Sequence, residues 1–495
     1  MSTACTRRSA LKALAGLASV PLLGSFRDAH AQSPDNRYLF VVCAQGGADI
    51  RDAFLPTVTG EVAGNIRSHA PERIRSVGNF RCPEYEEGLR FYPGTSRTGA
   101  IQRPFLERHG ADLAVVANTG TSVNHIVGSR RWLNGNGLVL KGRTLLESHA
   151  LNHARADMPL PAVNLATAGF AEPGDDASLP GFARAENVQD ALLFGLGTHP
   201  TRGVLRQARA GQVESLLERA RRVREELDDQ SAFVRRFSQS ERLASFRKRR
   251  KETVPLMQEL DLITQLGLAA AGDGNLTEYG LNASPALDAL TENGLGAFAN
   301  DSFAAQAALA FLLVKSGAST AVSIGSPSNP VVGPDVSGEP FTLTHTPLAY
   351  DFSHTDHMPT QAAMWDRVLG VTDGLIRLLK ATTHPAGGTY WERSLVYIAT
   401  EFGRTLQGDA NNAFGTGHEL NNGSVLISPL LQGGRVFGGL DPDSGRTLGF
   451  NPNSGDLDPA VMVSEPELVA TIAKTLGHTL SPEDESRVLP ALIRG

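Results

Sequence analysis

Short runs of apolar residues alternate along the chain with longer segments in which apolar residues recur at helical spacing. The short runs predict buried strands at residues 38–43, 113–117, 321–324 and 395–399, and a last strand beginning at 426–427. The spaced pattern predicts helices over residues 303–315, 364–379 and 465–476. This alternation is typical of an α/β fold, with a mostly parallel central sheet and helices on both faces.

Residues 202–252 break this pattern, because 15 of them are Lys or Arg and 8 are Asp or Glu, with Leu and Val spaced among them. The pattern predicts a charged helical insertion, either one long helix or a helical hairpin, within the α/β domain. Its most basic stretch, residues 247–251, is either a solvated helix face or a patch for an anionic polymer or a membrane surface.

Residues 1–31 have the three parts of an export signal. Arg7 and Arg8 lie in a charged region, residues 13–24 are small and apolar, and residues 29–31 (Ala-His-Ala) form a small-x-small cleavage site. The paired arginines resemble a twin-arginine (Tat) signal, which exports proteins already folded. An ordinary secretory signal or a buried helix is the alternative. We therefore expect a periplasmic or secreted bacterial protein that uses the Tat export machinery.

Composition narrows the class of protein further. The 495-residue chain is 41% hydrophobic and 20% charged, so we expect a large globular domain over residues 32–495. No apolar run reaches the roughly 20 residues of a membrane span, and a formal net charge of −6 disfavours a nucleic-acid partner. Three cysteines cannot build a disulfide framework, and Cys43 and Cys82 are expected either to pair after export or to remain thiols.

Polar side chains follow several predicted strands, at the carboxyl ends where ligands bind in parallel sheets. Asp49 follows two glycines after the first strand, and a carboxylate there suits a hard metal ion. Thr121 and Ser122 follow the second strand and precede a predicted helix, where a hydroxyl either caps the helix or attacks an ester.

Residues 351–357 (Asp-Phe-Ser-His-Thr-Asp-His) hold two His and two Asp within seven positions. Imidazole and carboxylate groups are the usual ligands of zinc, manganese and iron. His354, Asp356 and His357 are therefore candidate metal ligands, with a solvated polar loop as the alternative.

The strand ending at residue 399 is followed by Glu401 and Arg404, and His418 lies in a Gly-rich loop further on. Arg404 could hold a phosphate or sulfate group through two parallel hydrogen bonds. The alternative is an internal Glu401–Arg404 ion pair without a catalytic role. Four clusters of this kind favour a single site, because unrelated turns would not repeatedly place Asp, His and Glu at one sheet edge.

These residues carry a resemblance to a bacterial exported family called domain of unknown function 1501. The matching stretches are Gly46-Gly47-Ala48-Asp49, Asn124-His125, Asp356-His357 and, most specifically, Thr400-Glu401-Phe402-Gly403-Arg404-Thr405 with Gly415-Thr416-Gly417-His418. Their order and intervals resemble the family over roughly residues 38–440. That family is similar to the alkaline phosphatase and sulfatase superfamily, which implies an alkaline-phosphatase-like fold, one or two divalent metal ions at the carboxyl edge of the sheet, and a Ser or Thr nucleophile.

Carried over by position, the resemblance implies metal ligands at Asp49, Glu401 and His418, and a second group at His354, Asp356 and His357. Where family members usually have Ser-His, this chain has Asn124-His125. Asparagine cannot act as a nucleophile, so Thr121, Ser122 or a water molecule would have to do so.

The residues and the resemblance together predict an exported hydrolase of phosphate or sulfate esters that uses a divalent ion (Zn, Mn or Ca). Thr121, Ser122 and Arg404 are its expected catalytic residues, and an anionic ester is its expected substrate. The alternative is an exported binding or assembly protein that has this fold without catalysis. A third hypothesis is a polymer-binding protein that uses the basic insertion.

Overall fold

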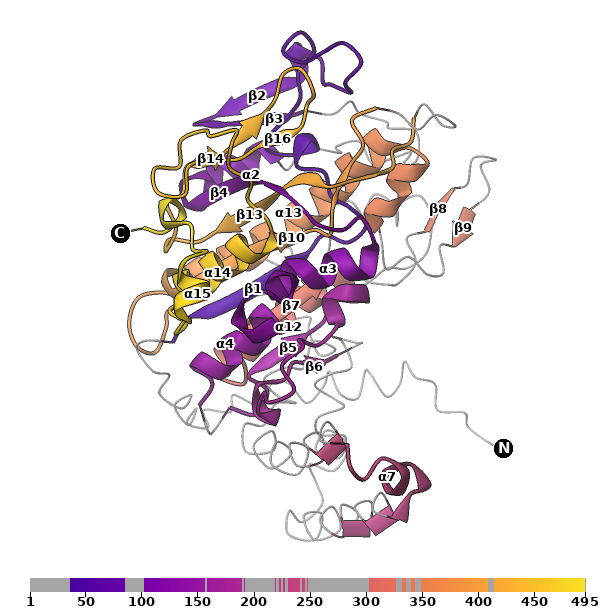
Figure 1. Cartoon of the computed structure of the whole chain (residues 1–495), viewed down its shortest axis with the longest axis vertical. Coiled ribbons are helices and arrows are strands. Elements are labelled where there is room, and N and C mark those ends of the chain that lie inside the picture. The colour runs from indigo at the N-terminus through magenta and orange to yellow at the C-terminus, as the bar shows by residue number, and fades with distance from the viewer. Residues whose placement is uncertain are drawn as a thin grey trace, which may run out of the picture.

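The computed structural model describes residues 36–84, 102–155, 158–188, 191, 302–325, 332–334, 340–342, 349–407 and 414–494, with short pieces of 219–247. The expected export signal at residues 1–31 lies outside the described residues. Of the expected charged insertion, only pieces are described, among them helix α7 (Ala232–Arg236) (Figure 1).

An eight-stranded sheet in the order β14-β4-β13-β10-β1-β7-β5-β6 forms the centre of the molecule (Figure 1). Its strands are β1 (Tyr38–Cys43), β4 (Leu113–Thr119), β5 (Ala162–Asn164), β6 (Glu186–Asn187), β7 (Ala321–Gly325), β10 (Ser394–Ala399), β13 (Asn421–Ile427) and β14 (Arg435–Phe437). Neighbouring strands pair in parallel except at β13, which is antiparallel to both β10 and β4. The predicted α/β fold with a mostly parallel sheet is therefore confirmed. The prediction of a strand beginning at residues 426–427 is wrong in detail, because those residues end β13.

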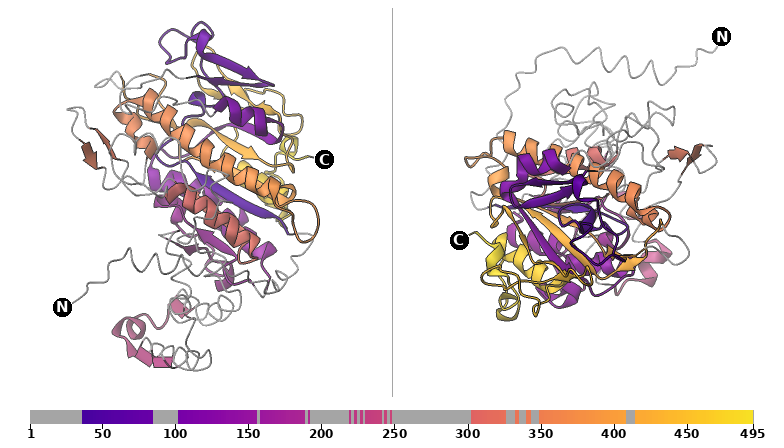
Figure 2. Two further views of the ribbon diagram at one scale, coloured as in Figure 1. Left: turned by 180° about the vertical axis from the view of Figure 1, so that it is seen from behind. Right: turned by 90° about the horizontal axis from the view of Figure 1, so that it is seen from above.

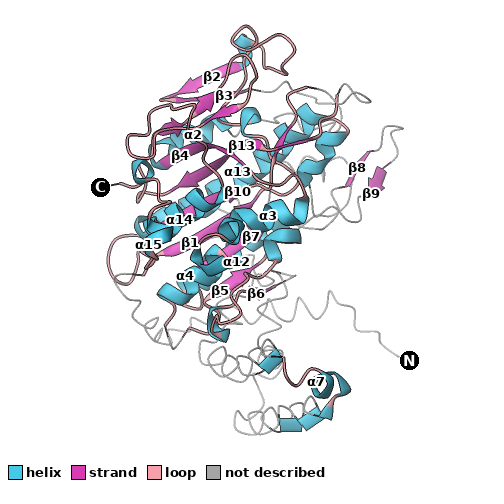
Figure 3. Cartoon of the chain, viewed as in Figure 1, coloured by secondary structure: helices cyan, strands magenta, loops and turns pink. Residues whose placement is uncertain are grey.

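Helices cover both faces of the sheet, as the continuous apolar character of its central strands requires. Alternate residues of β1 pack into two separate cores. One contains Tyr38, Phe40 and Val42, and the other contains Leu39, Val41 and Cys43. The first core lies under α2 (Gln102–His109), α12 (Ser302–Lys315) and α13 (His357–Ala381). The second lies under α3 (His125–Asn134), α4 (Leu145–His153) and α14 (Glu465–Thr475). Figures 1 and 2 show these two layers from opposite sides, and Figure 3 separates helices from strands by colour.

Several smaller elements lie outside the central sheet and its covering helices (Figure 3). They are β2 (Ile74–Val77) with β3 (Phe80–Pro83), β8 (Val332–Pro334) with β9 (Pro340–Thr342), β11 (Gly403–Arg404) with β12 (His418–Glu419), β15 (Gly439–Leu440) with β16 (Thr447–Leu448), and the short helix α15 (Pro482–Glu485). None of the helices in the described ranges is both long and apolar enough to cross a membrane.

Helix α13 begins at His357, seven residues before the predicted start at 364. Pro359 lies in its first turn, where the missing N–H of proline has no helical partner to lose. The early start matters for the site, because it places His357 on a helix and leaves Asp351 and His354 in the preceding 3-10 turn (Ala349–His354).

Cys43 in β1 and Cys82 in β3 are separate buried thiols in this structure. Burial raises the pKa of the Cys43 thiol well above its usual value and that of Cys82 to about 12. Of the two alternatives for these cysteines, the structure therefore shows buried thiols.

Candidate metal centre

The carboxyl ends of β1, β4 and β10 and the start of the antiparallel β13 meet at one edge of the sheet. His125 begins the helix after β4, and Glu401 follows β10. The short ladder of β11 with β12 pairs Arg404 with His418, which brings the Gly-rich loop to this edge. Asp351 reaches the same place from the 3-10 turn before α13.

His125, Asp351 and His418 offer three ligand atoms that all lie within 4.8 Å of one another. Asp351 Oδ1 lies 3.4 Å from His125 Nε2 and 3.6 Å from His418 Nε2. Ligand atoms around a tetrahedral ion with bonds of about 2.0–2.1 Å are about 3.3 Å apart. Asp351 is therefore spaced from each imidazole as neighbouring ligands of one metal ion are, and two imidazoles with one carboxylate fit zinc, manganese or iron.

Hydrogen bonds on the outer side of both imidazoles fix which nitrogen faces the centre. His125 Nδ1 lies 2.9 Å from Glu401 Oε1, and His418 Nδ1 lies 2.8 Å from the carbonyl oxygen of Val123. A carbonyl can only accept, so His418 carries its proton on Nδ1 and, in the neutral form, presents a lone pair on Nε2. The carboxylate of Glu401 favours the same tautomer of His125. Partners of this kind orient and strengthen metal-binding histidines.

His354 lies beside this group on its more exposed side. Its Nε2 is 2.9 Å from His418 Nε2 and 3.2 Å from Asp351 Oδ1. Both neighbours act as acceptors, so His354 carries its proton on Nε2 while no ion is bound. Burial and the nearby Arg404 lower the pKa of His354, so its imidazole is neutral at pH 7.

The carboxylate of Asp351 stabilises positive charge at the centre. Burial lowers the pKa of His125, but the hydrogen bonds to Asp351 and Glu401 outweigh it and raise the pKa to about 9. Burial alone would raise the pKa of Asp351, whereas the hydrogen bonds from His125 and His418 hold it far below its usual value. A cation between these groups is thus favoured by the carboxylate, and a metal ion would compete with the proton of His125.

Glu401 is fully buried and lies behind the centre, where it contacts the Nδ1 side of His125 and not the Nε2 side that faces Asp351. Its Oε1 also accepts a hydrogen bond from the Gly46 N–H at 2.8 Å, and Trp132 Nε1 donates to its backbone carbonyl. A Cβ added at Gly128 in α3 would lie 2.8 Å from that carbonyl, so glycine allows α3 to approach closely enough for His125 to meet Glu401.

Arg404 is also fully buried, and its predicted role as a clamp on substrate does not fit its contacts. The guanidinium donates to the carbonyl oxygens of Gly46, Gly47 and Tyr350 and to Asp351 Oδ1. These contacts hold the loop after β1 against the 3-10 turn that carries Asp351. Arg404 therefore positions Asp351, a candidate ligand of the centre, and does not face solvent.

Thr121 and Ser122, the predicted nucleophiles, make hydrogen bonds to residues outside the centre. The Thr121 hydroxyl donates to Glu465 Oε1 at 2.7 Å, and Ser122 Oγ accepts from the N–H of Asn124 at 3.2 Å. Asn124 caps α3 by accepting from the N–H of Val127. Among the hydrogen bonds of the described residues, none joins either hydroxyl to the centre.

Asp49 and His357, two further predicted ligands, lie in a different group that includes Asp52. Asp49 Oδ2 lies 2.7 Å from Arg51 and 3.1 Å from Arg67, and Asp52 Oδ2 lies 3.1 Å from Arg67 and 2.7 Å from His357 Nε2. Although burial raises the pKa of both carboxyl groups, their cationic partners lower it further, so both are ionised. Two carboxylates already face two arginines, and a divalent ion added there would be repelled by both guanidinium groups.

Asp356, the last of the predicted ligands, is buried at the residue before α13 and belongs to neither of these groups. The prediction thus named His354, Glu401 and His418 at the centre but passed over His125 and Asp351. Both lie inside the clusters that the sequence singled out. His149, His153 and His478, which also lie close together, were missed as well.

No protein-family model matches the chain, and no curated protein does.

Proposed function

We propose that the chain is an exported metal-dependent hydrolase of phosphate or sulfate esters, with His125, Asp351 and His418 as the ligands of one divalent ion. The proposal rests chiefly on the two imidazole Nε2 atoms that converge on Asp351 while Glu401 and the Val123 carbonyl occupy their Nδ1 atoms. Three protein ligands leave a coordination position open, which is the arrangement of catalytic metal sites.

A bound ion would supply Lewis acidity toward an anionic ester and would acidify water at the centre. His354 is the residue placed to take the proton of an attacking water molecule, because it is neutral, partly exposed and adjacent to His418. Thr121 and Ser122 are bonded elsewhere, so water, and not a side-chain hydroxyl, is the proposed nucleophile.

The surface beside the centre favours esters of an apolar alcohol. Val123 lies next to the centre, because its carbonyl oxygen is 2.8 Å from His418 Nδ1, and its side chain is 42% exposed. An aryl or alkyl group next to the reacting phosphorus or sulfur atom would cover this side chain and remove its apolar surface from water.

The test is turnover of aryl phosphate and aryl sulfate esters by the full chain, stripped of metal and reloaded with Zn, Mn or Ca. We expect His354→Ala to keep the ion and lose turnover, and His418→Ala to lose both. Thr121→Ala and Ser122→Ala should retain turnover. Loss of turnover in either hydroxyl variant, with the ion still bound, would show that a side chain and not water attacks the ester.

A second candidate function is binding or assembly by an exported protein with this fold and no catalysis. Asn124 favours it, because it caps α3 at the position where a Ser would serve as nucleophile in the family that the chain resembles. A loaded centre without turnover of any ester, together with a protein that co-purifies with the wild-type chain but not with His418→Ala, would support this function over hydrolysis.

We also propose membership of the domain of unknown function 1501 family, an alkaline-phosphatase-like fold and export through the Tat machinery. The mostly parallel sheet with one antiparallel strand supports the fold, and Arg7 and Arg8 support the export route. Replacing both arginines by lysine should block export of the full chain in a bacterial host. A mutated chain that still reaches the periplasm or the medium would contradict the Tat route.

A further inference from the structure

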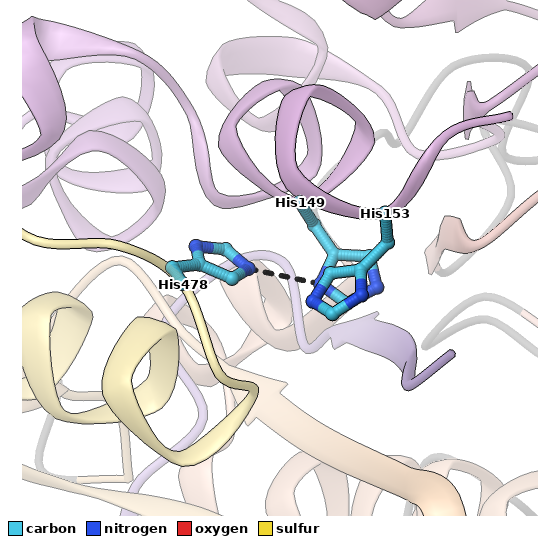
Figure 4. A group of neighbouring side chains, drawn as sticks. All are labelled: His149, His153 and His478. Carbon is cyan, nitrogen blue, oxygen red and sulfur yellow. Dashed lines mark hydrogen bonds between the residues drawn. The ribbon is translucent and has the colours of Figure 1, made fainter. Parts of the chain in front are cut away.

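Three histidines lie together at the opposite edge of the sheet from the proposed catalytic centre (Figure 4). His149 and His153 are one turn apart on α4, and His478 follows α14. His149 Nε2 lies 2.9 Å from the carbonyl oxygen of Arg37, the residue before β1, so the group is at the amino end of that strand. The six residues of β1, about 20 Å at ~3.3 Å per residue, separate the two edges.

One ring nitrogen of each histidine lies within 4.8 Å of the other two. His149 Nδ1 and His478 Nε2 share a hydrogen bond of 3.0 Å, dashed in Figure 4, which a metal ion would replace. This distance is close to the roughly 3.3 Å between neighbouring ligand atoms of a tetrahedral ion. The rings of His149 and His153 stack with their centroids 4.4 Å apart. Figure 4 shows these two side chains on helix α4 and His478 pointing toward them from the segment after α14.

The hydrogen bonds around the group leave lone pairs on its inner side. His149 Nε2 and His153 Nε2 each face a backbone carbonyl, those of Arg37 and Leu476, so in the neutral rings the lone pairs are on the two Nδ1 atoms. Among the described residues, His153 Nδ1 has no hydrogen-bond partner. His478 Nδ1 lies 3.2 Å from Ser148 Oγ, a hydroxyl that can accept as well as donate, so His478 can present its own lone pair on Nε2.

The rings are uncharged at neutral pH, as metal binding requires. Burial lowers the pKa of His478 to about 3 and also lowers that of His149 and His153. A cavity of about 540 Å³, lined by His153, Asn152, Arg37 and Arg155 among others, gives access from solvent. The two arginines would repel a bare cation, but they favour an anion as the ligand that completes its coordination in the cavity.

We propose that His149, His153 and His478 form a second metal site, which takes a late first-row transition ion such as zinc or copper and joins α4 to the segment after α14. Three imidazoles without a carboxylate select this class of ion over Mg, Ca or Mn. The site is remote from the catalytic edge, so its ion stabilises the fold and takes no part in ester hydrolysis.

Zinc alone is the probe. The full chain is stripped with a chelator and dialysed against micromolar zinc, and bound zinc per chain is measured for the wild type, His153→Ala and Asn152→Ala. Asn152 is the matched control, because it lies on the same helix and lines the same cavity without offering an imidazole. We expect His153→Ala to bind one zinc ion fewer than the wild type and Asn152→Ala to bind the same number.

This difference does not depend on the proposed function. If both sites bind zinc, the wild type should hold two zinc ions per chain and His153→Ala one. If the catalytic edge binds no metal, the wild type should hold one and His153→Ala none. Zinc should also raise the melting temperature of the wild type more than that of His153→Ala, and His153→Gln replaces the alanine variant if that fails to fold. Equal zinc content and equal thermal response in the wild type and both His153 variants would overturn the proposal.

Discussion

Glu401→Gln is the substitution that most sharply separates the proposed metal centre from a buried polar network. Glu401 is not one of the three proposed ligands, and its Oε1 accepts from His125 Nδ1 at 2.9 Å and from the Gly46 N–H at 2.8 Å. Glutamine can keep both bonds through its oxygen, but it loses the negative charge that makes His125 a stronger ligand. Its amide nitrogen replaces Oε2, which is buried without a hydrogen-bond partner in the described structure.

Loss of such an outer partner lowers metal affinity by about 10–100-fold, or roughly 1.4–2.8 kcal/mol. We therefore expect Glu401→Gln to weaken zinc binding by that factor without abolishing it, whereas His418→Ala should abolish binding at this edge. The assay is competition with a chromogenic chelator, in the His153→Ala background so that one site is measured.

Glu465→Gln is the matched control. Glu465 is equally buried, its Oε2 also has no partner in the described residues, and its Oε1 holds Thr121 and not a histidine. Both variants therefore bury a similar unpaired amide. Unchanged zinc affinity in Glu401→Gln, or an equal loss in Glu465→Gln, would refute the role assigned to Glu401.

Three further substitutions test the surroundings of the centre. Gly128→Ala should weaken zinc binding and destabilise the fold by about 1–3 kcal/mol, as measured by thermal unfolding, because its Cβ would lie 2.8 Å from the Glu401 carbonyl; an unchanged melting temperature would contradict this close approach. Arg404→Met should destabilise by about 3–5 kcal/mol, since Asp351 and the buried carbonyls lose their donor, and a stable variant with full zinc affinity would refute that role. Between pH 7 and pH 5, the free energy of unfolding of the wild type should fall by about 2 kcal/mol more than that of His357→Gln, as measured by urea unfolding. Burial lowers the folded-state pKa of His357 to about 4, so the unfolded chain binds the proton first and stability falls as the pH drops below about 6.5; equal pH dependence in both proteins would contradict this sign.

Much of the fold could be predicted because its central strands are buried on both faces and so read as continuous apolar runs. This applies to β1, β4, β7 and β10, whose ranges matched within two residues. The edge strands β6 and β14, and β5 next to β6, have two or three residues each, which is too short for any periodicity to show.

The location of the site could be predicted more easily than its ligands. The sequence placed the chemistry at the carboxyl ends of β1, β4 and β10, where the centre lies. The choice between Asp351 and Asp356 depends on where α13 begins, since the 3-10 turn points Asp351 and His354 to the centre, whereas His357 on the helix meets Asp52. That boundary is hidden by Pro359, which usually ends a predicted helix.

Two further ligand assignments could not be made from the sequence. Asp49 was a reasonable ligand by position, but Arg51 and Arg67 neutralise it, and the second of these pairs depends on the tertiary fold. The sequence prediction considered His125 only together with Asn124. Asn124 caps α3, and this structural role explains the asparagine without a role in catalysis.

The most direct test of the central claim is anomalous diffraction at the zinc edge from crystals of the full chain soaked in zinc. We predict a peak within bonding distance of His125 Nε2, His418 Nε2 and Asp351 Oδ1. Crystals with no peak at that position, or with the ion beside Asp49 and Asp52 instead, would contradict the assignment of the metal centre.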